Sequence, residues 1–203
     1  MREGGPSTED LLQQLFTASR RPLDARRQQQ FLAYLRELQR WNRTLNLTSI
    51  RNMEEAVERH YCESLFVAQV LDVEPVTIVD VGSGGGFPGL PLAVLRPDCL
   101  VTLVESHQRK AVFLKEASRN LPNIRVLSKR SEDVEESFDW AISRAVSYEG
   151  LTASLKILAP RAALLTGLEE PPGSLGFEWE VGVQLPWGSQ RFLRVGSRVG
   201  CFT

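Results

Sequence analysis

The sequence contains few of the residues on which disulfide-rich proteins and metalloproteins depend. Its three cysteines, Cys62, Cys99 and Cys201, are odd in number and far apart, which fits neither a disulfide framework nor a clustered zinc site. We therefore expect three reduced thiols. The two histidines, His60 and His107, are also far apart in the sequence, and we expect no metal site.

Net charge and long apolar runs are lacking as well. The 24 basic and 25 acidic residues leave a formal charge of −1, so the overall field does not attract naked nucleic acid, although local basic patches are compatible with it. The apolar runs are strand-sized and too short to span a bilayer, and residues 1–6 lack the apolar core of a signal peptide. We expect a cytoplasmic protein that makes no membrane contact.

The 203 residues are enough for one sizeable core plus an extension. We expect an N-terminal helical extension over residues 1–72 and a Rossmann-like domain over residues 73–203 that forms one compact unit. Apolar periodicity predicts the helices of the extension over about residues 7–19, 24–40 and 53–71, with a structured loop over 41–50. The arginines of the second helix form either a solvated face or an RNA-facing surface, and the sequence leaves both open.

A glycine-rich turn follows the first predicted strand of the second domain. The β-branched run from Val76 to Val81 is typical of a buried strand in a parallel sheet, and Gly82-Ser83-Gly84-Gly85-Gly86-Phe87-Pro88-Gly89 comes directly after it. Glycines allow backbone N–H groups to approach a ligand closely. With Asp80 at the end of the strand, the segment predicts a cofactor cradle.

An acidic residue ends the second predicted strand. Glu105 follows the run Leu100–Val104, about 20 residues after the glycine turn, and an acid at this position can accept hydrogen bonds from both hydroxyls of a ribose. This suits S-adenosylmethionine as well as a dinucleotide. The dinucleotide pattern G-x-G-x-x-G fails from Gly82, because Phe87 stands at its third glycine, and from Gly84 it begins late relative to the strand. A dehydrogenase is therefore the less favoured alternative.

The remaining segments predict a parallel sheet that ends in an antiparallel hairpin, as in many S-adenosylmethionine-dependent methyltransferases. Strands are expected over residues 124–128, 138–143 and 162–166, helices over 108–120 and 148–159, and the hairpin over 177–184 and 190–195. Ser131 and Glu132 would lie at the carboxyl edge of the sheet, near an adenine. Arg144 would emerge at the same edge and contact cofactor or substrate, or form a salt bridge to a nearby acid.

Three segments carry a specific resemblance. They are residues 40–51 together with Arg59-His60 and Glu63-Ser64-Leu65, the turn from Asp80 to Gly89 with its Phe-Pro-Gly ending, and Ser143-Arg144-Ala145. Together they resemble the 16S ribosomal RNA guanine-N7 methyltransferases, the small-subunit methyltransferase G family, long called glucose-inhibited division protein B. The resemblance covers about residues 25–160.

This resemblance implies a fold, a reaction and a set of site residues. The implied fold is an α/β class I S-adenosylmethionine-dependent methyltransferase, with a mostly parallel seven-stranded sheet and an N-terminal helical extension. The implied substrate is N7 of one guanine, position 527 of 16S rRNA, in the small ribosomal subunit. The resemblance carries cofactor contacts over to Gly82, Phe87, Glu105, Ser131, Glu132 and Arg144. The strand and turn themselves add Asp80 and Gly84 as cofactor-binding candidates. The RNA-contacting candidates are Asn46, His60, Arg43 and Arg59, and His60 taken alone equally fits a packed structural histidine.

The sequence also departs from the family pattern. Thr166 stands where relatives usually carry a lysine between leucine and glycine, Tyr61-Cys62-Glu63 replaces Ile-Leu-Asp, and the region after Gly167 is short. The missing lysine and the short region after Gly167 keep a non-catalytic ribosome-assembly or RNA-binding factor open as an alternative. A methyltransferase for a small molecule is a second alternative, which the arginine-bearing helices and the Asn46 loop count against.

Methylation of guanine N7 is a simple reaction for an enzyme to catalyse. N7 carries an in-plane lone pair and no proton, so its methylation needs no general base, and alignment of the reactants can supply about 7 kcal/mol or more of the barrier. We therefore expect Arg144 to position substrate or cofactor. Because the N7 edge of A-form RNA lies in a deep, narrow groove, the target guanine should be in a loop or distorted region.

Overall fold

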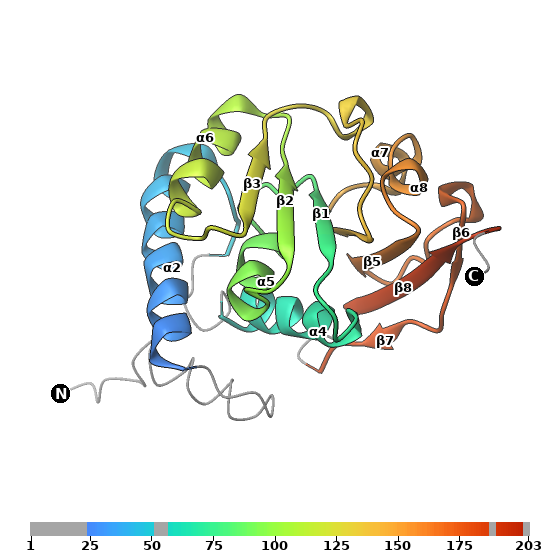
Figure 1. The fold of residues 1–203 in the computed structure, drawn as a ribbon, viewed down its shortest axis with the longest axis horizontal. Coiled ribbons are helices and arrows are strands. Elements are labelled where there is room, and N and C mark those ends of the chain that lie inside the picture. The colour runs from blue at the N-terminus through green and yellow to red at the C-terminus, as the bar shows by residue number, and fades with distance from the viewer. Residues whose placement is uncertain (1–23, 51–56, 187–189, 201–203) are drawn as a thin grey trace.

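A computed structural model describes residues 24–50, 57–186 and 190–200 of the chain (Figure 1). The helix expected over residues 7–19 lies outside these ranges, as does Cys201. The boundary expected at residue 72 stays a prediction.

The first described helix is longer than the sequence pattern predicts. Helix α2 spans Ala25–Leu45 and is capped at its start by Asp24, whose Oδ1 accepts a hydrogen bond from the Arg27 N–H at 2.8 Å. Its buried residues are Phe31, Tyr34, Leu35 and Leu38. The expected loop over 41–50 is wrong for its first half, because Trp41 and Leu45 continue the apolar stripe and pack on the core. The helix ends at Asn46, which has the left-handed conformation (φ 48°).

The helix expected over residues 53–71 is confirmed where the chain is described. Its first part, η1 (Val57–Cys62), is a π-helix, and α4 (Glu63–Val70) continues it as an α-helix. The wider π turn carries His60, and such turns are frequent at functional sites.

The described residues contain eight strands, which form one sheet. They are β1 (Thr77–Val81), β2 (Leu100–Val104), β3 (Ile124–Leu127), β4 (Trp140–Arg144), β5 (Arg161–Thr166), β6 (Phe177–Trp179), β7 (Val183–Gln184) and β8 (Phe192–Arg198). The order is β3-β2-β1-β4-β5-β8-β6, and β7 also pairs with β8. Strands β1 to β5 are parallel and β8 runs antiparallel to β5, which confirms the predicted fold class.

The sheet has eight strands rather than the expected seven because the segment over 177–184 is interrupted. Strand β6 pairs Phe177 with Arg198, whereas β7 pairs Val183 with Leu193, so the register along β8 slips by one residue between them. A one-residue slip of this kind is a β-bulge. Gly182 lies at the slip, where a Cβ would meet the Arg194 guanidinium at 2.7 Å.

Four further helices connect the strands: α5 (Gly89–Leu95), α6 (Gln108–Ala117), α7 (Tyr148–Thr152) and α8 (Leu155–Leu158). Two single 3-10 turns, η2 (Ser131–Asp133) and η3 (Gly173–Leu175), complete the described elements. The single helix expected over 148–159 is wrong, since α7 and α8 are separate. The break coincides with Ser154, which is buried and donates a hydrogen bond from its Oγ to Ser131 Oγ at 2.8 Å.

Successive side chains of the strands point to opposite faces of the sheet, and each face packs against its own hydrophobic core. Ile78, Leu103 and Ile142 face the core beneath α2, α4, α5 and α6, and Val79 and Ala141 face the core beneath α7, α8 and η3. Figure 1 shows α2 standing beside α6 near the β3 edge, with β6, β7 and β8 at the other end of the sheet. Helix α2 therefore packs on the same core as one face of the sheet.

Candidate functional site

The register of the sheet brings three predicted site residues to one edge. Val81, the last residue of β1, pairs with Val104 of β2 on one side and with Ser143 of β4 on the other. The residues that follow these three, Gly82, Glu105 and Arg144, are therefore neighbours. Glu105 lies on one side of the glycine turn, and Arg144 at the end of β4 lies on the other. Sequence reasoning predicted this arrangement correctly.

The glycine turn folds back over the end of β2. The N–H groups of Gly82 and Ser83 both donate to the Val104 carbonyl, at 3.0 and 3.1 Å. Gly82 has a φ of +71°, and a Cβ there would lie 2.5 Å from Val146 Cγ2, so no other residue fits without movement. From below, the Tyr34 hydroxyl of α2 donates to the Gly85 carbonyl. The N-terminal helix thus helps to hold the turn in place.

The Glu105 carboxylate lies directly against this turn. Its Oε2 accepts a hydrogen bond from the Gly84 N–H at 2.9 Å, and its Oε1 accepts one from the His107 N–H at 2.7 Å. The side chain is 8% exposed. Two backbone donors fix its orientation, and each carboxylate oxygen can accept a further hydrogen bond.

Asp80 lies beneath the turn rather than on its open side. The residue is fully buried, and its Oδ2 accepts a hydrogen bond from the Gly89 N–H at 3.0 Å. Its Oδ1 has no hydrogen-bond partner among the described residues. Burial raises the pKa of Asp80 to about 7, against the opposing effect of the Gly89 hydrogen bond. The structure places Asp80 in a supporting position, so the expected direct contact with a cofactor stays a prediction.

A cavity of about 320 Å³ opens between the glycine turn, Glu105, Arg144 and the loop after α2. The residues that line it are Leu47, Thr48, Ser49, His60, Gly82, Ser83, Gly84, Gly85, Phe87, Glu105, Lys110, Arg144 and Ala145. The loop is held by Asn42, whose Nδ2 donates to the Thr48 carbonyl and whose Oδ1 accepts from the Thr48 N–H, both at 2.9 Å. Asn42 therefore holds this loop in one shape.

His60 is both packed and on the cavity wall. Its ring stacks on Phe87 with centroids 3.9 Å apart, its Nε2 lies 3.0 Å from Thr48 Oγ1, and its Nδ1 lies 2.7 Å from Arg144 Nη1. Because a guanidinium can only donate, Nδ1 must accept, and Nε2 then carries the proton of a neutral imidazole. His60 therefore orients Arg144 and Thr48, which supports its structural interpretation.

A buried carboxylate organises the arginines. Glu63 is fully buried and accepts two hydrogen bonds from Arg191, from Nε and Nη2, both at 2.9 Å. Arg144 Nε lies 3.3 Å from the same carboxylate. The salt-bridge interpretation of Arg144 is thus correct, and the side chain also lines the cavity. Sequence reasoning did not select Glu63 or Arg191 as site residues, because 128 positions separate them and no local pattern links them.

The other predicted residues lie outside this cavity or cannot be placed. Ser131 and Glu132 are on η2, where the Ser131 hydroxyl binds Ser154, and neither lines the cavity. Arg43 and Asn46 are exposed at the end of α2, next to the loop that does line it. The side chain of Arg59 lies outside what the structure describes.

The cavity fits S-adenosylmethionine. Its volume is within the range of small-molecule sites. An oriented carboxylate at the end of β2 suits two ribose hydroxyls, and at Gly82, Gly84 and Gly85 no side chain stands between the backbone and a ligand. Lys110 and Arg144 supply cations that suit a carboxylate. Among the described residues, no group of three or more His, Cys, Asp and Glu side chains is placed to hold a metal ion.

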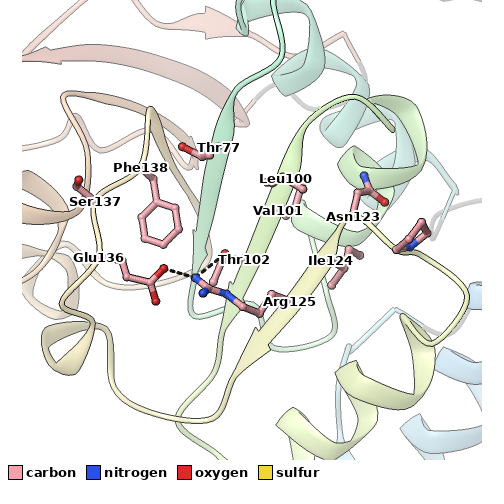
Figure 2. Close-up of a pocket in the computed structure, with 11 residues that line it drawn as sticks. Thr77, Leu100, Val101, Thr102, Asn123, Ile124, Arg125, Glu136, Ser137 and Phe138 are labelled. Carbon is pink, nitrogen blue, oxygen red and sulfur yellow. Dashed lines mark hydrogen bonds and ion pairs between the residues drawn. The ribbon is translucent and has the colours of Figure 1, made fainter.

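Another cavity, of about 330 Å³, lies at the opposite edge of the sheet, where β1, β2 and β3 begin (Figure 2). On its wall, Arg125 Nη2 donates hydrogen bonds to Glu136 Oε2 at 2.6 Å and to Thr102 Oγ1 at 3.3 Å. Figure 2 marks both contacts with dashed lines. No predicted site residue lines this cavity, so we do not assign the chemistry to it.

Two further findings bear on the sequence-based expectations. Cys62 and Cys99 are free, buried thiols, and burial raises the pKa of Cys99. None of the helices in the described ranges combines the length and the apolar character that a membrane crossing requires.

The chain is similar in sequence to one family of proteins. The family model of rRNA small subunit methyltransferase G matches residues 27–162. The chain is 41% identical over 142 residues to "Ribosomal RNA small subunit methyltransferase G" of Aquifex aeolicus, covering 67% of this chain and 72% of the relative. It is 48% identical over 120 residues to the protein of the same name from Nitrosomonas europaea, where the match covers 57% of this chain and only 55% of the relative.

Solved structures support the fold. A SAM-dependent methyltransferase from Aquifex aeolicus matches with a TM-score of 0.55 and 15% identity, over 71% of this chain and 93% of the other. A point mutant of MtNAS in complex with S-adenosylmethionine also matches with a TM-score of 0.55 and 15% identity, over 82% and 72% of the two chains. At these identities the likeness establishes the class I methyltransferase fold alone. The family model, however, spans well over half of the chain, and the chain belongs to the rRNA small subunit methyltransferase G family.

Proposed function

We propose that this protein is a cytoplasmic S-adenosylmethionine-dependent methyltransferase that methylates N7 of one guanine, position 527 of 16S rRNA, in the small ribosomal subunit. The observation that carries the proposal is the cavity at the carboxyl edge of the sheet, where the glycine turn lies between Glu105 and Arg144. The family model supports the substrate class, since its match contains every residue that lines this cavity.

Four groups of this chain would hold the cofactor. Glu105 would accept hydrogen bonds from the ribose hydroxyls, and the backbone of the turn at Gly82 and Gly84 would lie against the ligand. Arg144, oriented by His60 and Glu63, would bind its carboxylate. When bound, S-adenosylmethionine supplies an electrophilic methyl group on a sulfonium sulfur.

The residues around the cavity suit a reaction without proton transfer. Guanine N7 attacks with a lone pair that is already free, so no base has to remove a proton. His60 has both ring nitrogens engaged, one with Arg144 and one with Thr48, and is held as a positioning group. The protein contributes alignment of the nucleophile with the methyl group and exclusion of water.

A positively charged side chain lies beside Thr166, the position at which relatives usually carry a lysine. Thr166 Oγ1 accepts a hydrogen bond from Arg194 Nε at 3.4 Å, and Arg194 is buried at 5% exposure. A cation therefore lies beside this position, which weakens the argument for a degenerate, non-catalytic factor. The fit of the cavity to a cofactor counts against that alternative as well.

The test is a labelling experiment with three acceptors. The purified protein is incubated with methyl-labelled S-adenosylmethionine and either small ribosomal subunits that lack the modification, free 16S rRNA, or a small-molecule cell extract. Label in rRNA of the subunit supports the proposal. Label in the extract alone would indicate a small-molecule methyltransferase, and failure to bind the cofactor in equilibrium dialysis would indicate a non-catalytic factor.

A further inference from the structure

A second cavity, of about 450 Å³, adjoins the cofactor cavity. It lies at the carboxyl ends of β4 and β5, between residues 145–149 and 165–169, with Arg191 from the position directly before β8. Ala145 lines both cavities. This residue has a φ of +58°, a conformation that alanine rarely adopts and that proteins tend to keep at functional sites. The strained turn after β4 thus forms the boundary between the two spaces.

Arg191 is the only cation among the described residues that line the second cavity. Its Nε and Nη2 both bind Glu63, so the plane of the guanidinium is fixed by a fully buried carboxylate. The backbone is fixed as well, because the Arg191 carbonyl accepts a hydrogen bond from the Leu185 N–H at 2.8 Å. Within the described residues no hydrogen bond is made by Nη1, the third nitrogen of the group.

The chemistry of guanine matches such a donor. Guanine carries two acceptors on one edge, N7 and O6, whereas adenine carries a donor, the N6 amino group, in place of O6. A guanidinium only donates hydrogen bonds. A fixed guanidinium near O6 would therefore accept guanine, reject adenine, and leave the neighbouring N7 lone pair free to react.

We propose that the second cavity receives the acceptor guanine and that Arg191, held by Glu63, is a specificity-determining residue that donates a hydrogen bond to O6. The proposal rests on the proposed guanine-N7 methylation. Ala145 separates the two cavities, so a guanine bound by O6 in the second would present N7 toward the first. Methylation places a positive charge on the guanine ring, and the Glu63 carboxylate offsets the charge of the arginine beside it.

The experiment removes the two partners of this hydrogen bond separately. Small subunits are reconstituted with 16S rRNA that carries, at the target position, either guanine or 2-aminopurine, which keeps N7 and lacks O6. Methylation kcat/KM is measured for the wild type and for Arg191→Gln, and cofactor affinity is measured for both. Arg119→Gln, which removes an exposed arginine from α6's C-terminal flank, is the matched control.

The wild type should methylate guanine about 10- to 100-fold faster than 2-aminopurine, a preference in the range of a base-specific arginine contact. In Arg191→Gln the two rates should become nearly equal, with cofactor affinity within about twofold of the wild type; Arg119→Gln should keep the full preference. If Arg191→Gln keeps the wild-type preference for guanine over 2-aminopurine, the inference is wrong. A rise in KM that is equal for both bases would also leave this preference unchanged, and it would indicate that Arg191 contacts a phosphate.

Two further measurements keep these outcomes distinct. If Arg191→Gln does not fold because Glu63 is left unpaired, Arg191→Lys keeps the charge without the planar donor group and should also lose most of the preference. If the wild type methylates neither base while it still binds the cofactor, the proposed function itself is wrong. That result is separable from a failure that concerns Arg191 alone.

Discussion

The Nδ1 atom of His60 lies 2.7 Å from Nη1 of Arg144, although 84 positions separate the two residues in the sequence. The contact joins the π-helical turn η1 to the end of β4, and both residues line the cavity beside the glycine turn. Because the imidazole accepts this hydrogen bond, it orients the guanidinium and cannot also receive a substrate proton at the same atom.

His60→Ala should therefore reduce methylation without abolishing it. Loss of the ring removes the acceptor for Arg144 and the stacking surface on Phe87, and we expect kcat/KM to fall by on the order of tenfold. Removal of a general base typically costs on the order of 10² to 10⁴. Steady-state rates with small subunits separate the two cases, and a loss beyond about a thousandfold would show that His60 takes part in proton transfer.

Asp80 should make stability depend on pH in a direction unusual for a carboxylate. Its pKa rises from 3.8 in the unfolded reference to about 7 when folded, so between these values the folded protein holds a proton that the unfolded chain has released. The free energy of unfolding should therefore fall as pH rises from about 4 to about 7, by up to about 1.4 kcal/mol per pH unit from this group.

Asp80→Asn tests this dependence, since an amide cannot ionise and its oxygen can still accept the Gly89 hydrogen bond. Urea unfolding at several pH values should show a flatter profile for the variant and a gain over the wild type at pH 8. A variant that is less stable than the wild type at pH 8 would mean that the charged carboxylate stabilises the turn.

Glu63→Gln should destabilise the protein strongly. The change leaves Arg144 and Arg191 without their shared buried carboxylate, and breaking a buried ion pair costs about 3 to 5 kcal/mol. Glu136→Gln is the control, because Glu136 pairs with Arg125 at an exposed site where the expected loss is about 0 to 1 kcal/mol. Equal midpoints for the two variants in urea would contradict the structural importance of Glu63.

Glu105→Gln should weaken cofactor binding by about 10- to 100-fold, the effect of about 1.4 to 2.8 kcal/mol, because one carboxylate oxygen becomes a donor. Isothermal titration calorimetry measures the change. Glu132→Gln is informative beside it, since Glu132 was expected near the adenine and does not line the cavity. We expect little change for that variant, and a comparable loss in both would restore the sequence-based expectation.

Periodicity and motif position predicted the elements that build the site. Asp80 is the last but one residue of β1, Glu105 directly follows β2, and Arg144 ends β4. Parallel strands present their carboxyl ends at one edge, so the proximity of these residues follows from the strand assignment alone. The strand assignment does not predict that the Asp80 side chain is buried beneath the glycine turn. This burial depends on Gly89, whose missing side chain leaves the space that the Asp80 carboxylate fills.

Other features depend on packing between distant segments. The extension of α2 through Trp41 arises because its ring packs near Phe113 of α6, with centroids 6.0 Å apart. The bulge between β6 and β7 arises from pairing with β8. The ion pair of Glu63 with Arg191 joins the extension to the last part of the sheet. No local window of the sequence contains both partners of any of these contacts.

The central claim concerns one atom of one nucleotide, and nucleotide-resolution mapping of the product tests it most directly. Small subunits labelled by the wild-type protein are treated by reduction and aniline, which cleaves RNA at 7-methylguanine, and the cleavage site is read by primer extension. We predict one new cleavage, at guanine 527 of 16S rRNA, that is absent without the protein and much reduced with Glu105→Gln. Cleavage at another guanine, or label in rRNA that aniline does not cleave, would contradict the account.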